Sequence, residues 1–326
     1  MAPTILHATR HHHIDDVAIG PEFTAIAASS LVGDTWDGRI ILLPHIATDG
    51  PTATEVPTAV GNAAVTWLAA DTLAVGDDRG DVTIWQTRAL LEPTGRTDGP
   101  PAAFLTFAEH SQPVTAVVGA SGVSGRLASV SMDGTAKVWA ATVAGECTAT
   151  LEHLPQHSWC DVNVHAAVWL DAGAQSLATG ASDGVARVWD LRASGPAALR
   201  FAAHSAPLLS VAAGAAESQL LAGSECGSLL LFDTRKLDAP VVVARTPGGA
   251  VSTLAASAHL ACGSESGTVS LMDPRDLKVL QTRSVHADRV SCVSWLTPPS
   301  STSSGVLLSG SWDKRLMRLD FEPAAL

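Results

Sequence analysis

The chain has 326 residues, of which 46% are hydrophobic and 16% are charged, and its formal net charge is −12 at pH 7. This length allows two or three average domains or one large all-β domain, and the apolar content allows a sizeable core. The negative charge argues against direct nucleic-acid binding, because such binding depends on Lys and Arg replacing counterions. It suits a basic protein partner better.

The sequence contains no run of eighteen apolar residues, so no membrane span is predicted. The first residues, MAPTILHATRHHHIDD, lack the apolar core of a signal peptide. We therefore expect a soluble intracellular protein without a membrane partner. The five cysteines include no CxxC pair, so zinc and thioredoxin chemistry lack their ligand spacing. We expect buried free thiols at these positions, which are Cys147, Cys160, Cys226, Cys262 and Cys292.

One unit recurs seven times along the chain. It consists of a short apolar run, small residues, a turn and an alternating strand that ends in a large apolar residue. A turn residue precedes that large residue by five positions in every copy. In chain order the pairs are Gly38 and Leu43, Gly80 and Trp85, Gly134 and Trp139, Gly184 and Trp189, Gly227 and Phe232, Gly267 and Met272, and Lys314 and Leu319.

The seven turn positions lie 40 to 54 residues apart, which leaves room for four strands in each repeat. This period is typical of a WD-repeat β-propeller. We therefore predict an all-β fold, a single seven-bladed WD-repeat β-propeller over residues 1–326. Its third strands should end near residues 43, 85, 139, 189, 232, 272 and 319. Residues 1–13 precede the first blade, and pairing them with the last strand of blade 7 would close the ring.

Histidine and aspartate recur at fixed places in the repeat, which indicates a structural role. Three histidines end the strands that precede inner strands, and two aspartates lie in turns six residues before a tryptophan. We expect these residues to support the blades, with a His–Ser–Asp–Trp hydrogen-bond network in the third copy. They are His110, His204, His286, Asp133, Asp183, Trp139 and Trp189.

The remaining candidates for chemistry are weak. Asp77 and Asp78 are neighbours, and adjacent residues at a strand end point to opposite faces, so a solvated turn is expected rather than an acid–base pair. His11, His12 and His13 cannot all reach one metal ion from an extended strand, which favours a flexible polar terminus. We predict no metal, no cofactor and no catalytic residue, and conclude that the protein is not an enzyme.

The first copy, AASSLVGDTWDGRIILL, is longer than the others. Nine residues separate Ala28 from Asp37, whereas five separate Ala128 from Asp133. With the turn placed at Asp37-Gly38, the extra residues should form a longer loop that carries an exposed tryptophan. That loop contains Leu31, Val32, Asp34, Thr35 and Trp36. Trp36 either anchors a partner, since tryptophan is enriched in interface hot spots, or folds back to fill a gap in blade 1.

Two other tryptophans compete for a binding role. Trp312 lies in the variable position of an ordinary turn, and Trp159 lies in a long connection before the inner strand of blade 4. Each is either an anchor or a cover for the core. Trp67, Trp169 and Trp295 recur at the ends of inner strands and are expected to be structural.

The first copy also carries a family resemblance. AASSLVGDTWDGRIIL, followed by AVTWLAADTLAVGDDRGDVTIWQ, resembles the first two blades of the methylosome protein 50 family, and ESGTVSLMDPRDLKVL is similar to that family's sixth blade. These stretches cover residues 25–86 and 260–296 approximately, and the intervening blades match only as generic WD repeats. The elongated pattern ASSL-x-G-x-x-W-x-G is unusual among propellers.

The resemblance implies a non-catalytic subunit of a hetero-oligomer in the cytoplasm and nucleus. Members of the family bind the N-terminal TIM-barrel domain of the type II protein arginine methyltransferase and help to present substrates such as histones and Sm proteins. Their first-blade loop enters a pocket on the methyltransferase, and Trp36 matches the inserted tryptophan. This chain has Asp34 where members of the family have a basic residue.

Two alternatives remain open. Substrate receptors of cullin-type ubiquitin ligases carry WDxR after the third strand of a blade, and VWDLR matches this motif, with FDTR and MDPR as looser versions. The ligase-adaptor contacts would then be Arg192, Arg235 and Arg275. A generic WD-repeat scaffold is the other alternative.

Overall fold

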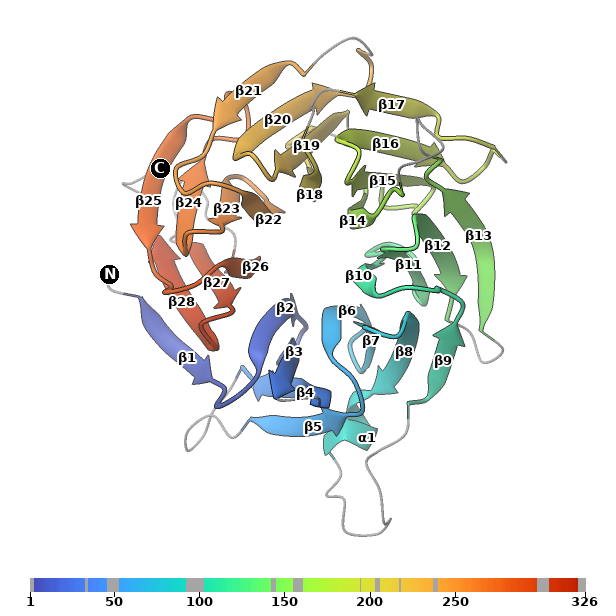
Figure 1. Ribbon diagram of the computed structural model, residues 1–326, viewed down its shortest axis with the longest axis vertical. Coiled ribbons are helices and arrows are strands. Elements are labelled where there is room, and N and C mark those ends of the chain that lie inside the picture. The colour runs from blue at the N-terminus through green and yellow to red at the C-terminus, as the bar shows by residue number, and fades with distance from the viewer. Residues whose placement is uncertain are drawn as a thin grey trace.

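The computed structural model describes residues 3–32, 35–45, 53–91, 103–141, 145–154, 161–193, 195–202, 206–216, 218–236, 240–297 and 305–321. These residues form seven four-stranded antiparallel sheets, arranged as blades around a central axis (Figure 1). The predicted seven-bladed β-propeller is therefore confirmed. In this described part of the chain, no helix has the length and apolar character needed to span a membrane.

Each of the first six blades is a continuous segment, and its four strands follow one another in chain order from the axis to the outer edge. Blade 1 contains β2 (His13–Ile19), β3 (Phe23–Val32), β4 (Thr35–Pro44) and β5 (Thr54–Thr58). Blade 2 contains β6 (Asn62–Ala69), β7 (Thr72–Asp77), β8 (Asp81–Gln86) and β9 (Leu105–Ala108), and blade 3 contains β10 (Val114–Gly119), β11 (Arg126–Ser131), β12 (Thr135–Ala140) and β13 (Glu146–Glu152).

Blade 4 contains β14 (Val164–Trp169), β15 (Ser176–Ala181), β16 (Val185–Asp190) and β17 (Leu199–Ala202). Blade 5 contains β18 (Leu208–Ala213), β19 (Gln219–Ser224), β20 (Ser228–Asp233) and β21 (Val242–Arg245). Blade 6 contains β22 (Val251–Ala256), β23 (Leu260–Ser264), β24 (Thr268–Met272) and β25 (Val279–Ser284).

The N-terminal strand closes the ring. Blade 7 contains β26 (Val290–Thr297), β27 (Gly305–Ser311) and β28 (Arg315–Phe321), and its fourth strand is β1 (Thr4–Ala8), which pairs antiparallel with β28. Both ends of the described chain therefore lie in one blade (Figure 1). This pairing covers the edge that β28 would otherwise expose.

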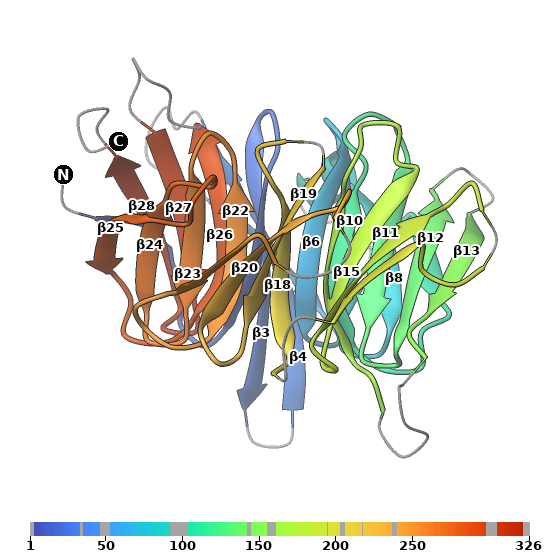
Figure 2. The same ribbon diagram turned by 90° about the horizontal axis from the view of Figure 1, so that it is seen from above.

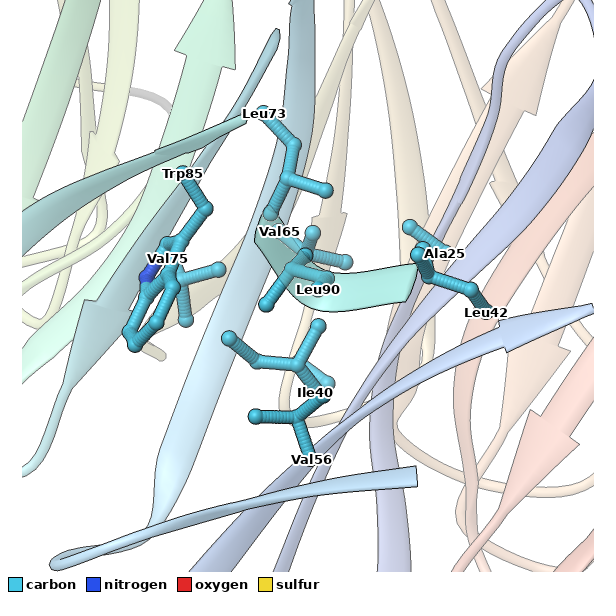
Figure 3. Packing of buried hydrophobic residues seen from close by; sticks show 10 residues of the cluster. Ala25, Ile40, Leu42, Val56, Val65, Leu73, Val75, Trp85 and Leu90 are labelled. Atoms are coloured by element: carbon cyan, nitrogen blue, oxygen red, sulfur yellow. The ribbon is translucent and has the colours of Figure 1, made fainter. Parts of the chain in front are cut away.

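The hydrophobic core lies between neighbouring blades. Figure 3 shows the cluster between blades 1 and 2, where Ile40 and Leu42 from β4 pack near Val65 and Leu73 from β6 and β7. Leu90, from the short helix α1 (Thr87–Leu91), adds to the same cluster. Because each sheet is covered on both faces by its neighbours, second and third strands are rich in buried apolar residues.

A β-bulge interrupts every inner strand near its start, at the third residue of β2 and at the second residue of the other six. The register between each inner strand and its neighbour skips one residue there, which leaves that residue outside the regular ladder. The seven bulge residues are Asp15, Ala63, Thr115, His165, Leu209, Ser252 and Ser291. Their shared position decides which side chains face the axis.

Hydroxyl groups at the bulges connect adjacent blades. Thr115 donates to the Val164 carbonyl at 2.6 Å, and Ser252 and Ser291 donate to inner-strand carbonyls of the following blade. Three tryptophans make a second set of links, as their predicted structural role requires. The indole N–H groups of Trp67, Trp169 and Trp295 donate to carbonyls of the preceding inner strand at 3.0–3.1 Å.

Blade 3 contains a buried four-residue hydrogen-bond network. His110 Nδ1 lies 2.9 Å from Asp133 Oδ2, and His110 Nε2 lies 2.8 Å from Ser129 Oγ. Trp139 Nε1 donates to the same Ser129 oxygen at 2.8 Å. Burial lowers the pKa of His110, although Asp133 raises it. A neutral imidazole with its proton on Nδ1 satisfies this arrangement, because Nε2 then accepts from the serine hydroxyl.

The other networks differ from the prediction. In blade 4, Asp183 pairs with Arg187 rather than with a histidine among the described residues. His153 bonds Thr179 there, and Trp189 donates to the same hydroxyl oxygen.

In blade 7, His286 bonds Asp313 and Ser309, but Leu319 replaces the tryptophan. His204 lies outside the described residues. The sequence held signals for both missed residues, since TLEH ends in His153 as TFAEH ends in His110, and SWDK aligns Asp313 with Asp133.

The expectation of buried thiols holds only in part. Cys262 and Cys292 are buried, and burial raises the pKa of both thiols far above the usual range. Cys147 is partly buried, whereas Cys226 is exposed because it lies in the turn between β19 and β20. Cys160 lies outside the described residues.

Replacing Ser129 by alanine should destabilise the protein more than replacing Ser309. Ser129→Ala removes the bonding partner of both His110 and Trp139, whereas Ser309→Ala removes that of His286 alone. We expect losses in the free energy of unfolding of about 2–4 kcal/mol and about 1–2 kcal/mol, respectively. Urea denaturation of both variants measures this difference, and equal losses would show that the tryptophan bond contributes nothing.

Candidate functional site

The hairpin of β3 and β4 is longer than every other second-to-third strand hairpin. Each of its strands has ten residues, compared with six in β11 and β12. Figure 2 shows that it extends beyond the neighbouring strands on one face of the ring. The predicted turn at Asp37-Gly38 is wrong, because the ladder continues through Ser30↔Asp37 and Leu31↔Trp36 to Val32↔Thr35.

The predicted long loop is therefore a strand extension in large part. Leu31, Val32, Thr35 and Trp36 all belong to the paired ladder, and Asp34 lies outside the described residues. The alternation of strand residues consequently fixes which way Trp36 points. A rigid β-ribbon carries the tryptophan in place of an irregular loop.

Trp36 leans toward blade 2 while remaining 47% exposed. A Cβ atom built on Gly61 would lie 2.1 Å from Trp36 Nε1 and 2.2 Å from Asp78 Oδ2. Only glycine at position 61 leaves room for the indole and the carboxylate to approach so closely. Trp36 is thus seated at its edge and open to solvent over about half of its surface.

The opposite side of the hairpin is held by the N-terminal segment. Asp37 accepts a hydrogen bond from Ser30 at 2.5 Å, and its second oxygen lies 3.3 Å from His12 Nε2. His12 is buried, and His13 Nδ1 lies 2.7 Å from the Trp312 carbonyl oxygen. The expectation of a flexible polar terminus is wrong here, because His12 and His13 pack between blades 1 and 7.

A cavity of ≈ 510 Å³ lies at the axis beside this hairpin. All seven bulge residues line it, together with side chains from the second-to-third strand turns. The turn residues include Asp78, Glu225, Glu265 and Trp312, and Trp36 lines the cavity from the hairpin. The cavity therefore opens on the face from which the hairpin projects.

Carboxylates dominate the charge of this cavity. Asp15 accepts a hydrogen bond from Ser29 at 2.5 Å, yet burial raises its pKa to about 7, and the nearby Asp78 raises it further. Burial also raises the pKa of Asp78, although contact with Trp36 lowers it. Burial lowers the pKa of His165, which favours the neutral imidazole.

Asp77 and Asp78 do not form a solvated turn as predicted. Asp77 is buried at the end of β7 and accepts hydrogen bonds from the backbone N–H groups of Arg79 and Asp81. Asp78 lines the cavity, where its buried Oδ2 lies beside Trp36 Nε1. One aspartate thus shapes the turn, whereas the other supports the indole of Trp36.

Of the two other tryptophans considered as anchors, the structure describes Trp312 and does not describe Trp159. Trp312 lines the same cavity as Trp36 and is 39% exposed, with the guanidinium carbon of Arg289 4.7 Å from its ring centroid. Trp159 lies outside the described residues. Among the described residues, no three His, Cys, Asp or Glu side chains gather as metal ligands.

The three arginines of the ligase hypothesis lie on the other face. Each follows the end of a third strand, opposite to the turn that precedes that strand. Arg192 and Arg235 form paired hydrogen bonds with Asp190 and Asp233 at 2.7–3.0 Å, while their side chains stay 70% and 75% exposed. Arg275 is also exposed.

Three segments of the chain match a known family model. Residues 103–140, 145–190 and 277–317 match the WD domain, G-beta repeat. Each segment begins near an outer strand and ends in the third strand of the next blade. The chain is a WD-repeat protein.

The WD-repeat segments end in blades 3, 4 and 7, which hold the histidine networks around Ser129, Thr179 and Ser309. No curated protein matches the chain. WD40 β-propellers are in general non-catalytic scaffolds for protein interactions, which is the coarse function that the repeats support. The residues that matter for a partner are then those that the repeat does not require.

Asp16, next to the cavity, should make stability depend on pH. It accepts hydrogen bonds from the backbone N–H groups of Val65 and Val17, but burial raises its pKa to about 7 from an ordinary value of 3.8. The folded state therefore keeps a proton that the unfolded state releases between about pH 4 and 7. Stability from this group is fully present below pH 4 and is lost as the pH rises to 7.

Asp16→Asn should remove this dependence. Urea denaturation between pH 4.5 and 7.5 should show the variant gaining about 1–3 kcal/mol relative to the wild type as the pH rises. The difference between the two curves cancels the histidines, whose lowered pKa values act in the opposite direction. Asp276→Asn is the control, because Asp276 also accepts a backbone hydrogen bond but is exposed. Parallel curves for wild type and Asp16→Asn would contradict the assignment.

Proposed function

We propose that this WD-repeat protein is a non-catalytic adaptor of a protein arginine methyltransferase, which it binds through the β3–β4 hairpin. The observation that carries the proposal is the paired, projecting hairpin with Trp36 half exposed near its end. The resemblance of residues 25–86 to the methylosome protein 50 family supplies the partner's identity. The partner surface would be the N-terminal TIM-barrel domain of the methyltransferase.

The geometry around Trp36 favours an anchor over a core-filling role. Gly61 and Asp78 seat the indole on one side, and His12 holds Asp37 on the other. A partner would therefore meet a side chain that is already ordered, which lowers the entropic cost of binding. The adaptor would act in the cytoplasm and nucleus and help to present arginine-rich substrates such as histones and Sm proteins.

A second candidate is supported by the opposite face. Exposed arginines on three successive blades, with Arg192 and Arg235 held in place by their own aspartates, would suit a substrate receptor of a cullin-type ubiquitin ligase. Because the two candidate surfaces lie on different faces, a variant of one leaves the other intact.

Affinity purification from cells separates the two functions. The wild type should recover a protein arginine methyltransferase, and Trp36→Ala should lower that recovery about 30-fold or more, since a buried aromatic anchor typically contributes at least about 2 kcal/mol. Gly61→Ala should also weaken recovery, because the new methyl group displaces the indole from its seat without removing it.

Met132→Ala is the matched control, because it removes another exposed apolar side chain on the same face. Trp312→Ala tests the rival anchor. Recovery of ligase adaptor in place of a methyltransferase, with loss in Arg192→Ala or Arg235→Ala, would overturn the main proposal in favour of the second. Full methyltransferase recovery by Trp36→Ala would exclude the hairpin as the anchor.

A further inference from the structure

The outer part of the β3–β4 hairpin extends past the strands that flank it. Pairing of β2 with β3 reaches Ser29, and pairing of β5 with β4 reaches Gly38. Beyond these two residues the hairpin continues as a two-stranded ribbon of residues 30–32 and 35–37 (Figure 2). A two-stranded ribbon on its own is at best marginally stable in water. The direction in which Trp36 points therefore depends on the side-chain contacts that hold this ribbon from outside.

Side chains from two different places brace the ribbon at its base. On the side of blade 2, Trp36 lies against the seat formed by Gly61 and Asp78. On the opposite side, His12 Nε2 lies 3.3 Å from Asp37 Oδ2. The first brace belongs to the neighbouring blade, whereas the second belongs to the segment that closes the ring.

Asp37 connects the second brace to both strands of the ribbon. It pairs with Ser30 in the ladder and accepts a hydrogen bond from the Ser30 hydroxyl through Oδ1 at 2.5 Å, while Oδ2 faces His12. The Ser30 bond and the nearby His12 lower the pKa of Asp37, although burial raises it. Hydrogen bonds to a carboxylate are stronger than those between neutral groups. Asp37 thus ties β3 to β4 and offers His12 a charged acceptor.

The docking of β1 sets the position of His12. Thr9, directly after β1, donates its backbone N–H to the Lys314 carbonyl at 3.0 Å, and its hydroxyl group donates to the His12 carbonyl. On the other side of His12, His13 Nδ1 lies 2.7 Å from the Trp312 carbonyl oxygen. His12 is buried between these attachments. Its imidazole is therefore held at the hairpin when β1 is docked on β28.

The attachment of β1 is itself short. The strand pairs with β28 at Thr4, Ile5, His7 and Ala8, and a bulge at Leu6 interrupts this ladder. The side chain of Ile5 is 52% exposed. Segments near a chain end that bury little surface open more readily than the core does. Closure of the ring by β1 is therefore a local equilibrium that can shift while the rest of the blade stays folded.

We propose that the docking of β1 on β28 and the orientation of Trp36 are coupled, with His12 as the positioning residue between them. When β1 is docked, His12 braces Asp37, and the ribbon holds Trp36 in its seat. When β1 detaches, the ribbon loses this brace and Trp36 loses its fixed direction. Because such coupling is reciprocal, a partner that binds Trp36 also tightens β1 on β28. The partner locks the ring shut, and a strand that displaces β1 weakens the hold on the partner.

This inference deepens the proposed function by naming how the anchor is controlled, and it rests on that function only for the identity of the partner. The coupling itself lies within one chain. It is therefore measured first without the methyltransferase.

The experiment is amide hydrogen exchange of the full chain, followed by mass spectrometry. His12→Ala should raise the exchange rate of residues 30–32 and 35–37 about fivefold or more, because the ribbon loses a bond to a charged group. By reciprocity, residues 4–8 of β1 should also exchange faster, although His12 lies outside that strand. His12→Gln should keep both rates near those of the wild type, because the glutamine amide nitrogen also donates to Asp37.

His45→Ala is the matched control. The imidazole of His45 lies 3.0 Å from the Thr24 hydroxyl, at the end of the same two strands that is remote from Trp36. Its removal should leave the exchange of the ribbon and of β1 unchanged. Asp37→Asn is the second variant, in case His12→Ala does not fold. It keeps the shape of an exposed side chain but removes its charge, and it should raise both exchange rates.

Unchanged exchange of the ribbon in both His12→Ala and Asp37→Asn, or a faster ribbon beside an unchanged β1, would overturn the inference. An equal increase in His45→Ala would also overturn it, because it would indicate general loosening. In the affinity purification, His12→Ala should lower methyltransferase recovery about three- to tenfold, whereas His12→Gln should not. If the wild type recovers no methyltransferase, the proposed function fails, and the exchange rates still decide the coupling.

Discussion

The bulge near the start of every inner strand is the constraint on which the centre of this propeller depends. It lifts one residue per blade out of the ladder and turns it toward the axis, where a hydroxyl group can reach the next blade. The core between sheets holds the blades together by apolar packing, but these polar links define the axis. A side chain at a bulge therefore lines the cavity, and in three blades it also bonds the next inner strand.

Ring closure brings the two ends of the chain to the same surface. β1 completes blade 7, and this places His12 and His13 between blade 7 and the first-blade hairpin. Residues 299 positions apart, His13 and Trp312, consequently lie in contact. Ring closure thus contributes one side of the candidate site, through His12 and His13, whereas Gly61 and Asp78 support Trp36 from the side of blade 2.

The period of the repeat was enough to predict the number of blades, since the spacing of turns reflects local hairpins. Features that depend on pairing between distant residues could not be predicted in the same way. Asp37-Gly38 has the composition of a turn, but the ladder between Leu31 and Trp36 overrides it. Asp15 and Asp16 were missed because their partners, Ser29 and Val65, come from other strands. His153 and Asp313 were readable from the alignment of copies and needed no tertiary contact to be found.

The register of the hairpin points the side chains of Trp36 and Asp37 to opposite faces, where they make different contacts. Neighbouring residues on a strand point to opposite faces, so Asp37 bonds His12 while Trp36 turns to Gly61 and the axial cavity. An irregular loop of the same length would have to order itself when a partner arrives, whereas this ribbon has already met that entropic cost during folding. Changing the hairpin by a single residue would exchange the two side chains, placing a carboxylate in the cavity and an indole against the N-terminal segment. The length of the first copy therefore determines both how far the hairpin projects and which way the Trp36 side chain points.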